Sequence, residues 1–327
     1  MAEPPAISVV LPYRNARQWL AQTIVSLAAE RDVSFELVAI NDQSSDNSEE
    51  LLSRLTQGWP TQMMQSLHGS GRGVSAARNL GIRAARAPVV AFLDADDRCL
   101  PGRLRQPWEL LQRQPELSHV HGGWQRIDGL GQFICAVEPW REGAAFNWNA
   151  ALEHKAVLPS AWTIRHDALI KLGGFDESLS HAEDVDLMVR LAAAGHKGNW
   201  LQQPLCRYRV HGQSASAQLT LLCEQLPAVV ERHLQQLEDP QHPWAEGVRY
   251  STISWCSWKC WSQGESARAL QLLQRALAHC PLPLPRRPVH FLEHMARSSK
   301  REGLPFDRKA LLASSFWQQA SAMLLLP

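Results

Sequence analysis

Short apolar runs alternate with helical hydrophobic spacing along the first hundred residues. Residues 7–11, 35–40 and 89–93 are largely apolar, β-branched runs of strand length. Between the first two, apolar residues over 20–28 recur every three or four positions, as on one face of a helix. This alternation predicts βαβ units and therefore an α/β fold with a mostly parallel central sheet.

A polar loop follows each of these expected strands, at residues 12–15, 41–46 and 94–97. Open α/β sheets bind ligands at the carboxyl ends of their strands, where such loops gather. We therefore expect the candidate functional residues to lie along one rim of the sheet.

The hydrophobic pattern changes beyond residue 213. Leucine and valine recur at spacings of three and four over residues 219–237, and few strand signals follow. Residues 241–327 also hold 11 lysines and arginines against 5 aspartates and glutamates, a local charge of +6. We expect an α/β domain over residues 1–215 and a helical domain over residues 216–327.

Composition narrows the class of protein. The 327 residues carry a formal net charge of +1, which does not favour nucleic acid as the main partner. Seven scattered cysteines without a Cys-x-x-Cys pair favour a reduced, cytoplasmic compartment, and Cys256 and Cys260 fit helix packing better than a zinc site. No apolar run reaches the length of a membrane span, and the first residues lack the features of a signal peptide.

Two carboxylates, Asp94 and Asp96, follow the apolar run 89–93. Such an Asp-x-Asp pair suits Mg²⁺ or Mn²⁺, which prefer oxygen ligands and leave positions open for phosphate oxygens. The alternative is a solvated turn in which Asp97 caps the next helix.

A second Asp-x-Asp pair, Asp184 and Asp186, opens a stretch with helical apolar spacing. Carboxylates in the first turn of a helix are stabilised by unpaired N–H groups, so capping explains them without function. If one carboxylate faces a cleft instead, it has the character of a general base.

Five blocks in this order resemble the family-2 glycosyltransferases with a GT-A fold, and the resemblance covers residues 6–213. The blocks are residues 7–15 (ISVVLPYRN), 41–46 (NDQSSD), 73–81 (GVSAARNLG), 92–97 (FLDADD) and 173–177 (GGFDE) with Glu183-Asp184. The resemblance implies a metal-dependent, inverting enzyme of the hexosyltransferase type that uses a nucleotide-diphosphate sugar, with UDP-sugar as the expected donor. It also implies a saccharide or lipid-linked saccharide acceptor and a role in polysaccharide biosynthesis.

The resemblance assigns the nucleotide base to Asp42, and the first loop adds Pro12, Tyr13 and Asn15 to the nucleotide-sugar site. The family usually has Asp-Asp-Gly at residues 41–43, whereas this chain has Asn-Asp-Gln. The asparagine lacks a charge and the glutamine restricts the turn, so the identity of the base is less firmly implied than the fold.

By the same resemblance, Asp94 and Asp96 bind the diphosphate and its Mg²⁺ or Mn²⁺, with Asp96 the more direct ligand. His211 ends the matched region and is a further candidate ligand or phosphate donor; the alternative is a packing or surface histidine. Arg78 and Arg72 are expected to pair with phosphates or with Asp94, and Arg72 is alternatively an exposed loop charge.

The resemblance makes Asp184 the general base that removes the proton of the acceptor hydroxyl, while Glu183 positions substrate or tunes the base. Trp162 is a candidate for stacking on a sugar ring, with core packing as the alternative.

Rival functions have less support. Residues 69–74 resemble a dinucleotide-binding fingerprint, but Val74 occupies the position of its third glycine, and the chain has no P-loop sequence. A noncatalytic sugar- or nucleotide-binding scaffold on the same fold is the remaining alternative. Residues 264–277 resemble one helix of a tetratricopeptide-type hairpin, and the basic C-terminal region is either a set of solvated helix faces or a contact to anionic membrane surfaces.

Overall fold

The computed structural model describes residues 4–142, 146–212, 214 and 218–326. The chain divides into two compact units, Met1–Gly212 and Gln213–Pro327. The boundary expected after residue 215 falls in the segment 215–217, outside the described residues.

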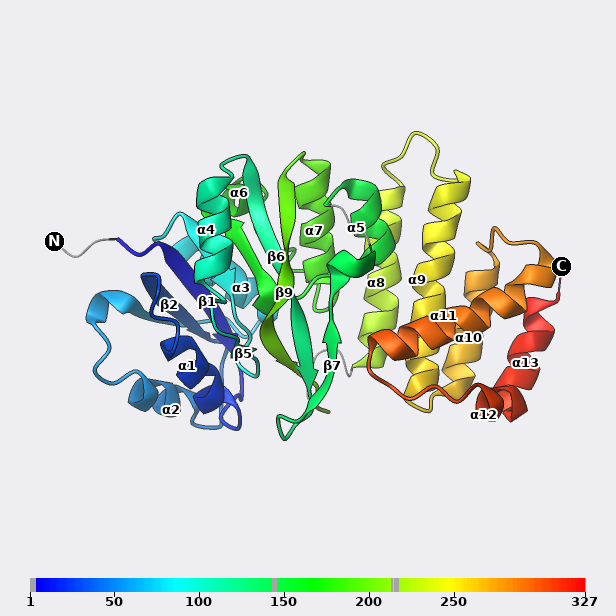
Figure 1. Cartoon of the computed structure of the whole chain (residues 1–327), viewed down its shortest axis with the longest axis horizontal. Helices are drawn as coiled ribbons and strands as arrows, with labels where there is room; N and C mark the ends of the chain where they lie inside the picture. The colour runs from blue at the N-terminus through cyan, green and yellow to red at the C-terminus, as the bar shows by residue number, and fades with distance from the viewer. Residues whose placement is uncertain (1–3, 143–145, 213, 215–217, 327) are drawn as a thin grey trace. The chain divides into compact units, whose positions relative to one another are not determined.

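Within the described residues, nine strands of the first unit form one sheet (Figure 1). Their order is β3-β2-β1-β4-β8-β6-β9-β5, and β7 pairs with the last residues of β6, Trp124–Ile127. The strands are β1 (Ile7–Tyr13), β2 (Phe35–Asn41), β3 (Met64–His68), β4 (Val89–Phe92), β5 (Arg98–Cys99), β6 (Leu117–Ile127), β7 (Phe133–Val137), β8 (Trp162–Arg165) and β9 (Lys197–Arg209).

The sheet is parallel from β3 to β4, as expected from the βαβ pattern, and mixed beyond β4. β8 runs antiparallel to both β4 and β6, whereas β6 and β9 pair in parallel. The α/β fold class is confirmed. The antiparallel strands beyond β4 were not predicted from the sequence pattern.

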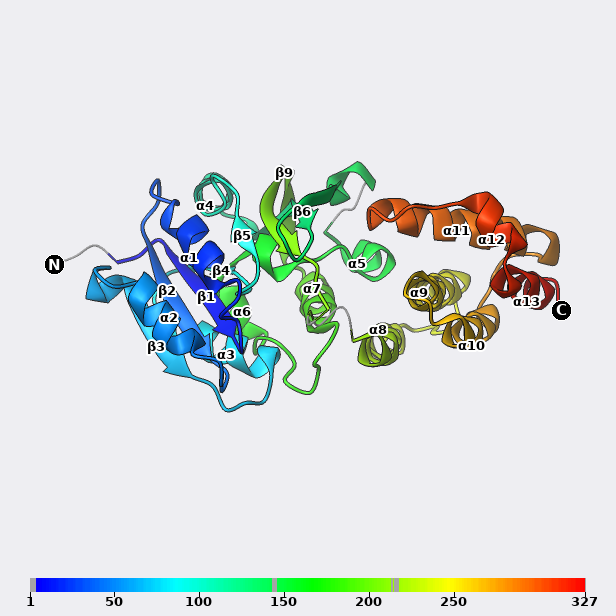
Figure 2. The ribbon, with the colours of Figure 1, turned by 90° about the horizontal axis from the view of Figure 1, so that it is seen from below.

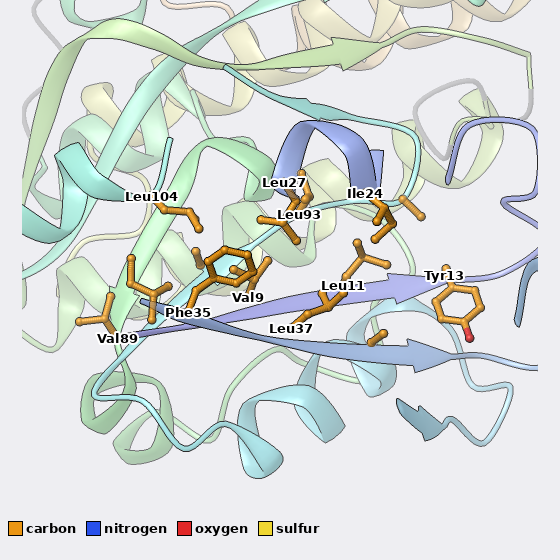
Figure 3. Close-up of a cluster of buried hydrophobic side chains, with 14 of the residues drawn as sticks. Val9, Leu11, Tyr13, Ile24, Leu27, Phe35, Leu37, Val89, Leu93 and Leu104 are labelled. Carbon is orange, nitrogen blue, oxygen red and sulfur yellow. The ribbon is translucent and has the colours of Figure 1, made fainter. Parts of the chain in front are cut away.

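Helices cover both faces of this sheet, and Figure 2 shows α1 and α4 on one side and α3 and α6 on the other. Alternate residues of β1, including Val9 and Leu11, pack with Ile24 and Leu27 of α1 in a buried core (Figure 3). The helices of this unit are α1 (Leu20–Ala28), α2 (Ser48–Leu55), α3 (Val74–Ala84), α4 (Arg105–Arg113), α5 (Trp148–His154), α6 (His166–Lys171) and α7 (Glu183–Ala193).

The buried Arg103 holds the centre of the sheet together. Its guanidinium donates to the carbonyl oxygens of Ser160, Phe92 and Trp162 and to the Thr163 hydroxyl, at 2.6–3.2 Å. These bonds join the end of β4 to the start of β8, and so fix the backbone from which the 94–97 loop leaves the sheet.

The second unit is helical among its described residues, as the sequence pattern predicts. Its helices are α8 (Leu219–Leu234), α9 (Pro243–Ser262), α10 (Ser266–Leu277), α11 (Arg287–Arg301), α12 (Arg308–Ala313) and α13 (Ser315–Leu324). Gly264, at φ +84°, turns the chain between α9 and α10. Across the described ranges, no helix has the length and hydropathy required to cross a membrane.

Candidate functional site

Asp42 follows β2 and organises the glycine-rich loop beside it. Its Oδ1 accepts the Gly71 amide at 2.7 Å and its Oδ2 accepts the Gly73 amide at 3.0 Å. Gly71 has φ +75°, and a Cβ there would collide with Oε1 of Gln43. Gln43 itself takes φ +62°, in the left-handed region. The turn therefore forms here without a glycine at residue 43.

The first loop supports residues 41–46. The carbonyl of Tyr13 accepts the Asp42 amide at 2.9 Å, and Oδ1 of Asn15 accepts the Ser45 amide at 2.8 Å. Pro12 and Tyr13 are buried, and burial followed by the nearby Glu49 raises the pKa of Tyr13 to about 12. Both side chains are buried, and Tyr13 lies in the hydrophobic core, so they support the loop from within; their contact with a nucleotide sugar stays a prediction.

Arg78 of α3 joins two carboxylates that lie far apart in the sequence. One nitrogen, Nη2, is 2.7 Å from Oδ1 of Asp94, and the other, Nη1, is 2.7 Å from Oε1 of Glu183. The guanidinium also lies 5.2 Å from the centre of the Phe175 ring. Although burial opposes its charge, the two carboxylates raise the pKa of Arg78. The structure thus brings together the acidic strand end and the start of α7.

Asp96 pairs with His211 at the far end of the same loop. Oδ2 of Asp96 is 2.9 Å from Nε2 of His211, and the imidazole stacks on Trp19 with 3.9 Å between ring centres. Asp97 is fully buried, and its Oδ1 accepts the Arg209 amide at 2.9 Å. Burial, then Asp96 and Asp94, raise the pKa of Asp97 well above its ordinary value. Asp97 is therefore an internal support rather than the helix cap considered from the sequence.

The second acidic pair opens α7, as the apolar spacing predicts. Asp186 is buried and bonded to Nε of Arg190 at 2.7 Å, so its role is structural. Asp184 is partly exposed, and its Oδ1 accepts the Val185 amide at 2.8 Å. Desolvation and the adjacent Glu183 raise the pKa of Asp184 to about 7. A carboxylate with this pKa can take up and release a proton at neutral pH.

Two predicted site residues have other roles. Trp162 is fully buried, and its Nε1 donates to Nδ1 of His119 at 3.2 Å, so no indole face is open to a sugar and the packing alternative holds. Arg72 is mostly exposed and forms an ion pair with Glu177 at 2.9 Å. It contacts neither Asp94 nor any other acidic residue of the 94–97 loop within the described part of the chain.

Three supporting residues were not found from the sequence. Trp19 stacks on His211, Ser160 accepts the Asp94 amide at 3.0 Å, and Nε of Arg209 donates to the Asp96 carbonyl at 3.0 Å. Arg209 had one signal, its position two residues before His211. The other two side chains meet the site only through tertiary contacts.

Comparison with known proteins matches residues 8–134 to the model of glycosyl transferase family 2. An uncharacterized glycosyltransferase of Rickettsia bellii is 26% identical over 212 residues, which are 64% of this chain and 29% of that protein. An uncharacterized glycosyltransferase of Methanocaldococcus jannaschii is 24% identical over 213 residues, 64% of this chain and 72% of that protein. The match to the Rickettsia bellii protein thus spans under a third of that relative's length.

Two solved structures share the fold. Staphylococcus aureus TarS 1-349 in complex with UDP-GlcNAc superposes with a TM-score of 0.60 at 14% identity, over 92% of this chain and 93% of that chain. The mannosyltransferase PcManGT from Pyrobaculum calidifontis, in complex with GDP-Man and Mn²⁺, superposes with a TM-score of 0.62 at 17% identity, over 98% of this chain and 84% of that chain.

Proposed function

We propose that this chain is a family-2 glycosyltransferase on a GT-A fold, and that it transfers a sugar from a UDP-sugar to an acceptor hydroxyl with inversion; the family model matches residues 8–134. The observation that carries the proposal is the Arg78 bridge between Asp94 and Glu183. It joins the acidic end of β4 to the first turn of α7, where Asp184 stands. Through these two bonds Arg78 holds Asp94, the proposed donor-binding carboxylate, next to the helix turn that carries Asp184, whose pKa is about 7.

Asp184 acts as the general base. The acceptor hydroxyl oxygen forms a bond to the anomeric carbon as the bond from that carbon to the diphosphate oxygen breaks. The electron pair leaves with the diphosphate, and the hydroxyl proton passes to the Asp184 carboxylate. Attack from the face opposite the leaving group inverts the anomeric carbon. The Glu183 carboxylate, which pairs with Arg78, raises the pKa of its neighbour Asp184.

The nucleotide base is assigned to the loop around Asp42. Each Asp42 oxygen accepts one backbone amide, and a carboxylate oxygen has a further lone pair that can accept an N–H of a base. UDP is the proposed nucleotide because Asp42 matches the base-binding aspartate of the resemblance. The neighbours that bind UDP-GlcNAc and GDP-Man support a nucleotide-sugar donor in general.

The donor chemistry at Asp96 and His211 fits Mg²⁺ or Mn²⁺. Oδ2 of Asp96 and Nε2 of His211 face each other at 2.9 Å, and these two side chains would hold the ion when it is bound. Asp94 keeps one carboxylate oxygen beyond the one bonded to Arg78. A divalent ion held there would neutralise charge on the leaving diphosphate. The protein residues hold the loop that presents these ligands, through Arg209 and Ser160.

The acceptor is proposed to be a saccharide or lipid-linked saccharide in polysaccharide assembly, used at the cytoplasmic face of a membrane. In the helical unit, Val289, Leu325 and Leu326 are exposed apolar residues, and Nη1 of Arg287 donates to the Leu326 carbonyl at 3.2 Å. Apolar side chains beside arginines suit a peripheral contact with anionic lipid.

The proposal is tested by incubating the protein with UDP-sugars, Mn²⁺ and saccharide acceptors, and by following UDP release and the anomeric protons by NMR. Transfer from an α-linked donor should give the β-linked product. The Asp184→Asn variant should release no UDP, whereas Asp167→Asn, an exposed acid paired with Lys171, should match the wild type. Binding of UDP-sugars without release, alike in all three proteins, would support the noncatalytic scaffold instead.

A further inference from the structure

Two arginines face each other across an antiparallel strand pair outside the site described above. Arg98 of β5 and Arg207 of β9 are direct partners in the register. Like charges in this position destabilise a sheet, because the side chains leave the same face a few ångströms apart. The Arg98–Arg207 pair is therefore expected to lower the stability of the protein when no ligand is bound.

No carboxylate of the described residues pairs with either arginine. Among the described residues, Arg98 donates from Nη2 to the neutral Oε1 of Gln22, and Arg207 donates from Nε to Oε1 of Gln125 at 3.3 Å. The buried Nε of Arg98 has no hydrogen-bond partner in the described part of the chain.

Arg98 and Arg207 are among the residues that line a groove of about 470 Å³. Its other walls come from α1 and from the turn after β5, and include Gln22, Val25, Ser26 and Pro101. The volume lies in the range of sites for small ligands. Arg209 adds no free charge, because its guanidinium donates to Gln22 and to the carbonyls of Asp96, Asp128 and Gly129.

We propose that this groove binds a phosphate group, with Arg98 and Arg207 as its donors. Two guanidinium groups present planar sets of N–H donors that match phosphate oxygens, and a bound phosphate would convert a repulsion into two attractive pairs. This site does not depend on the proposed sugar transfer.

The test measures the affinity of the whole chain for inorganic phosphate by calorimetry, at constant ionic strength set with chloride. The double variant Arg98→Gln with Arg207→Gln should bind phosphate at least tenfold more weakly, whereas Arg113→Gln, an exposed helix arginine, should bind as the wild type does. The double variant retains Asp42, Arg78, Asp94 and Asp96, so any phosphate bound at the nucleotide site persists in it. A smaller loss, or no binding by the wild type, would overturn the proposal.

Thermal unfolding without phosphate gives a second readout. The double variant should be as stable as the wild type or more stable, because the repulsive pair is gone; a clear fall in its melting temperature would show that the arginines serve the fold instead. Octyl phosphate then distinguishes the source. If octyl phosphate binds at least threefold more tightly than inorganic phosphate, and Val25→Ser removes this difference, the ligand is a phosphate ester with an apolar carrier. If the two affinities are equal, the ligand is free phosphate.

Discussion

Arg78 and Glu183 are 105 residues apart in the chain and 2.7 Å apart in the structure. The same guanidinium reaches Asp94 at the same distance, and its side chain is only 4% exposed. One buried cation therefore sets the spacing between β4 and α7. The position of Asp184 depends on it.

Replacing Arg78 should damage both stability and transfer. Arg78→Met leaves the Glu183 carboxylate buried without its partner, which should lower the free energy of unfolding by about 3–5 kcal/mol. Arg78→Lys keeps the charge but cannot bond two carboxylates in two directions, so folding should survive better than transfer. Denaturant unfolding and UDP-release rates measure the two effects. Arg83→Gln, an exposed change on the same helix, should stay within about 0.5 kcal/mol of the wild type.

Asp184→Asn should remove transfer and spare binding. An amide cannot accept the hydroxyl proton, and a positioned general base contributes about 10²–10⁴-fold to the rate. The affinity for UDP with Mn²⁺ should remain within a few-fold of the wild type, as measured by calorimetry. Comparable loss of affinity and rate would instead assign Asp184 to donor binding.

The pH dependence of kcat/KM should report the same carboxylate. As the proposed base, Asp184 can accept a proton only when it is ionised, and its pKa is raised to about 7. The rate should therefore fall about tenfold per pH unit well below 7 and level off above it. A kcat/KM that does not change between pH 5 and 8 would show that Asp184 is not the general base.

Stability should change with pH in the opposite sense. The folded pKa of Asp184 exceeds its unfolded value of 3.8, so the folded state binds the proton more tightly. The stabilisation from the protonated form is complete below about pH 4 and is lost as the pH rises through 7. Asp184→Asn should thus melt closer to the wild type at pH 4 and above it at pH 8, in paired thermal scans.

Gly71 should be essential for nucleotide affinity. Alanine at φ +75° costs about 1–2 kcal/mol, and a backbone that relaxes this strain shifts the Gly71 amide that Asp42 accepts; the flexible end of the Gln43 side chain, which the new Cβ would meet, can turn away. Gly58, at φ +89° with open space around it, is the matched control, because Gly58→Ala pays the conformational cost alone. Both variants should lose similar stability, and only Gly71→Ala should lose UDP affinity. Equal UDP affinities of the two variants would contradict the assignment of this loop to the nucleotide site.

Local pattern was sufficient to predict much of the fold. The apolar runs become β1, β2 and β4, and the apolar spacing after Asp184 becomes α7, because burial on two faces or on one helical face leaves a repeating signature. The antiparallel position of β8 left no such signature. Its direction is decided by contacts such as those of Arg103, which no short window of sequence contains.

The candidate site divides in the same way. Asp42, Asp94, Asp96 and Asp184 stand in loops or helix starts that the motifs mark. The sequence left Trp162 open between sugar stacking and core packing, because the choice depends on tertiary contacts such as that with His119, 43 residues away. The stack of Trp19 on His211 joins residues from opposite ends of the first unit.

The most direct test is calorimetric titration with UDP, GDP, CDP and TDP, each with Mn²⁺ and again with EDTA. The account predicts that UDP binds, that EDTA weakens this binding, and that Asp96→Ala binds no better with Mn²⁺ than without it. Absence of binding by all four nucleotides, or binding that neither EDTA nor the Asp96 variant changes, would contradict it.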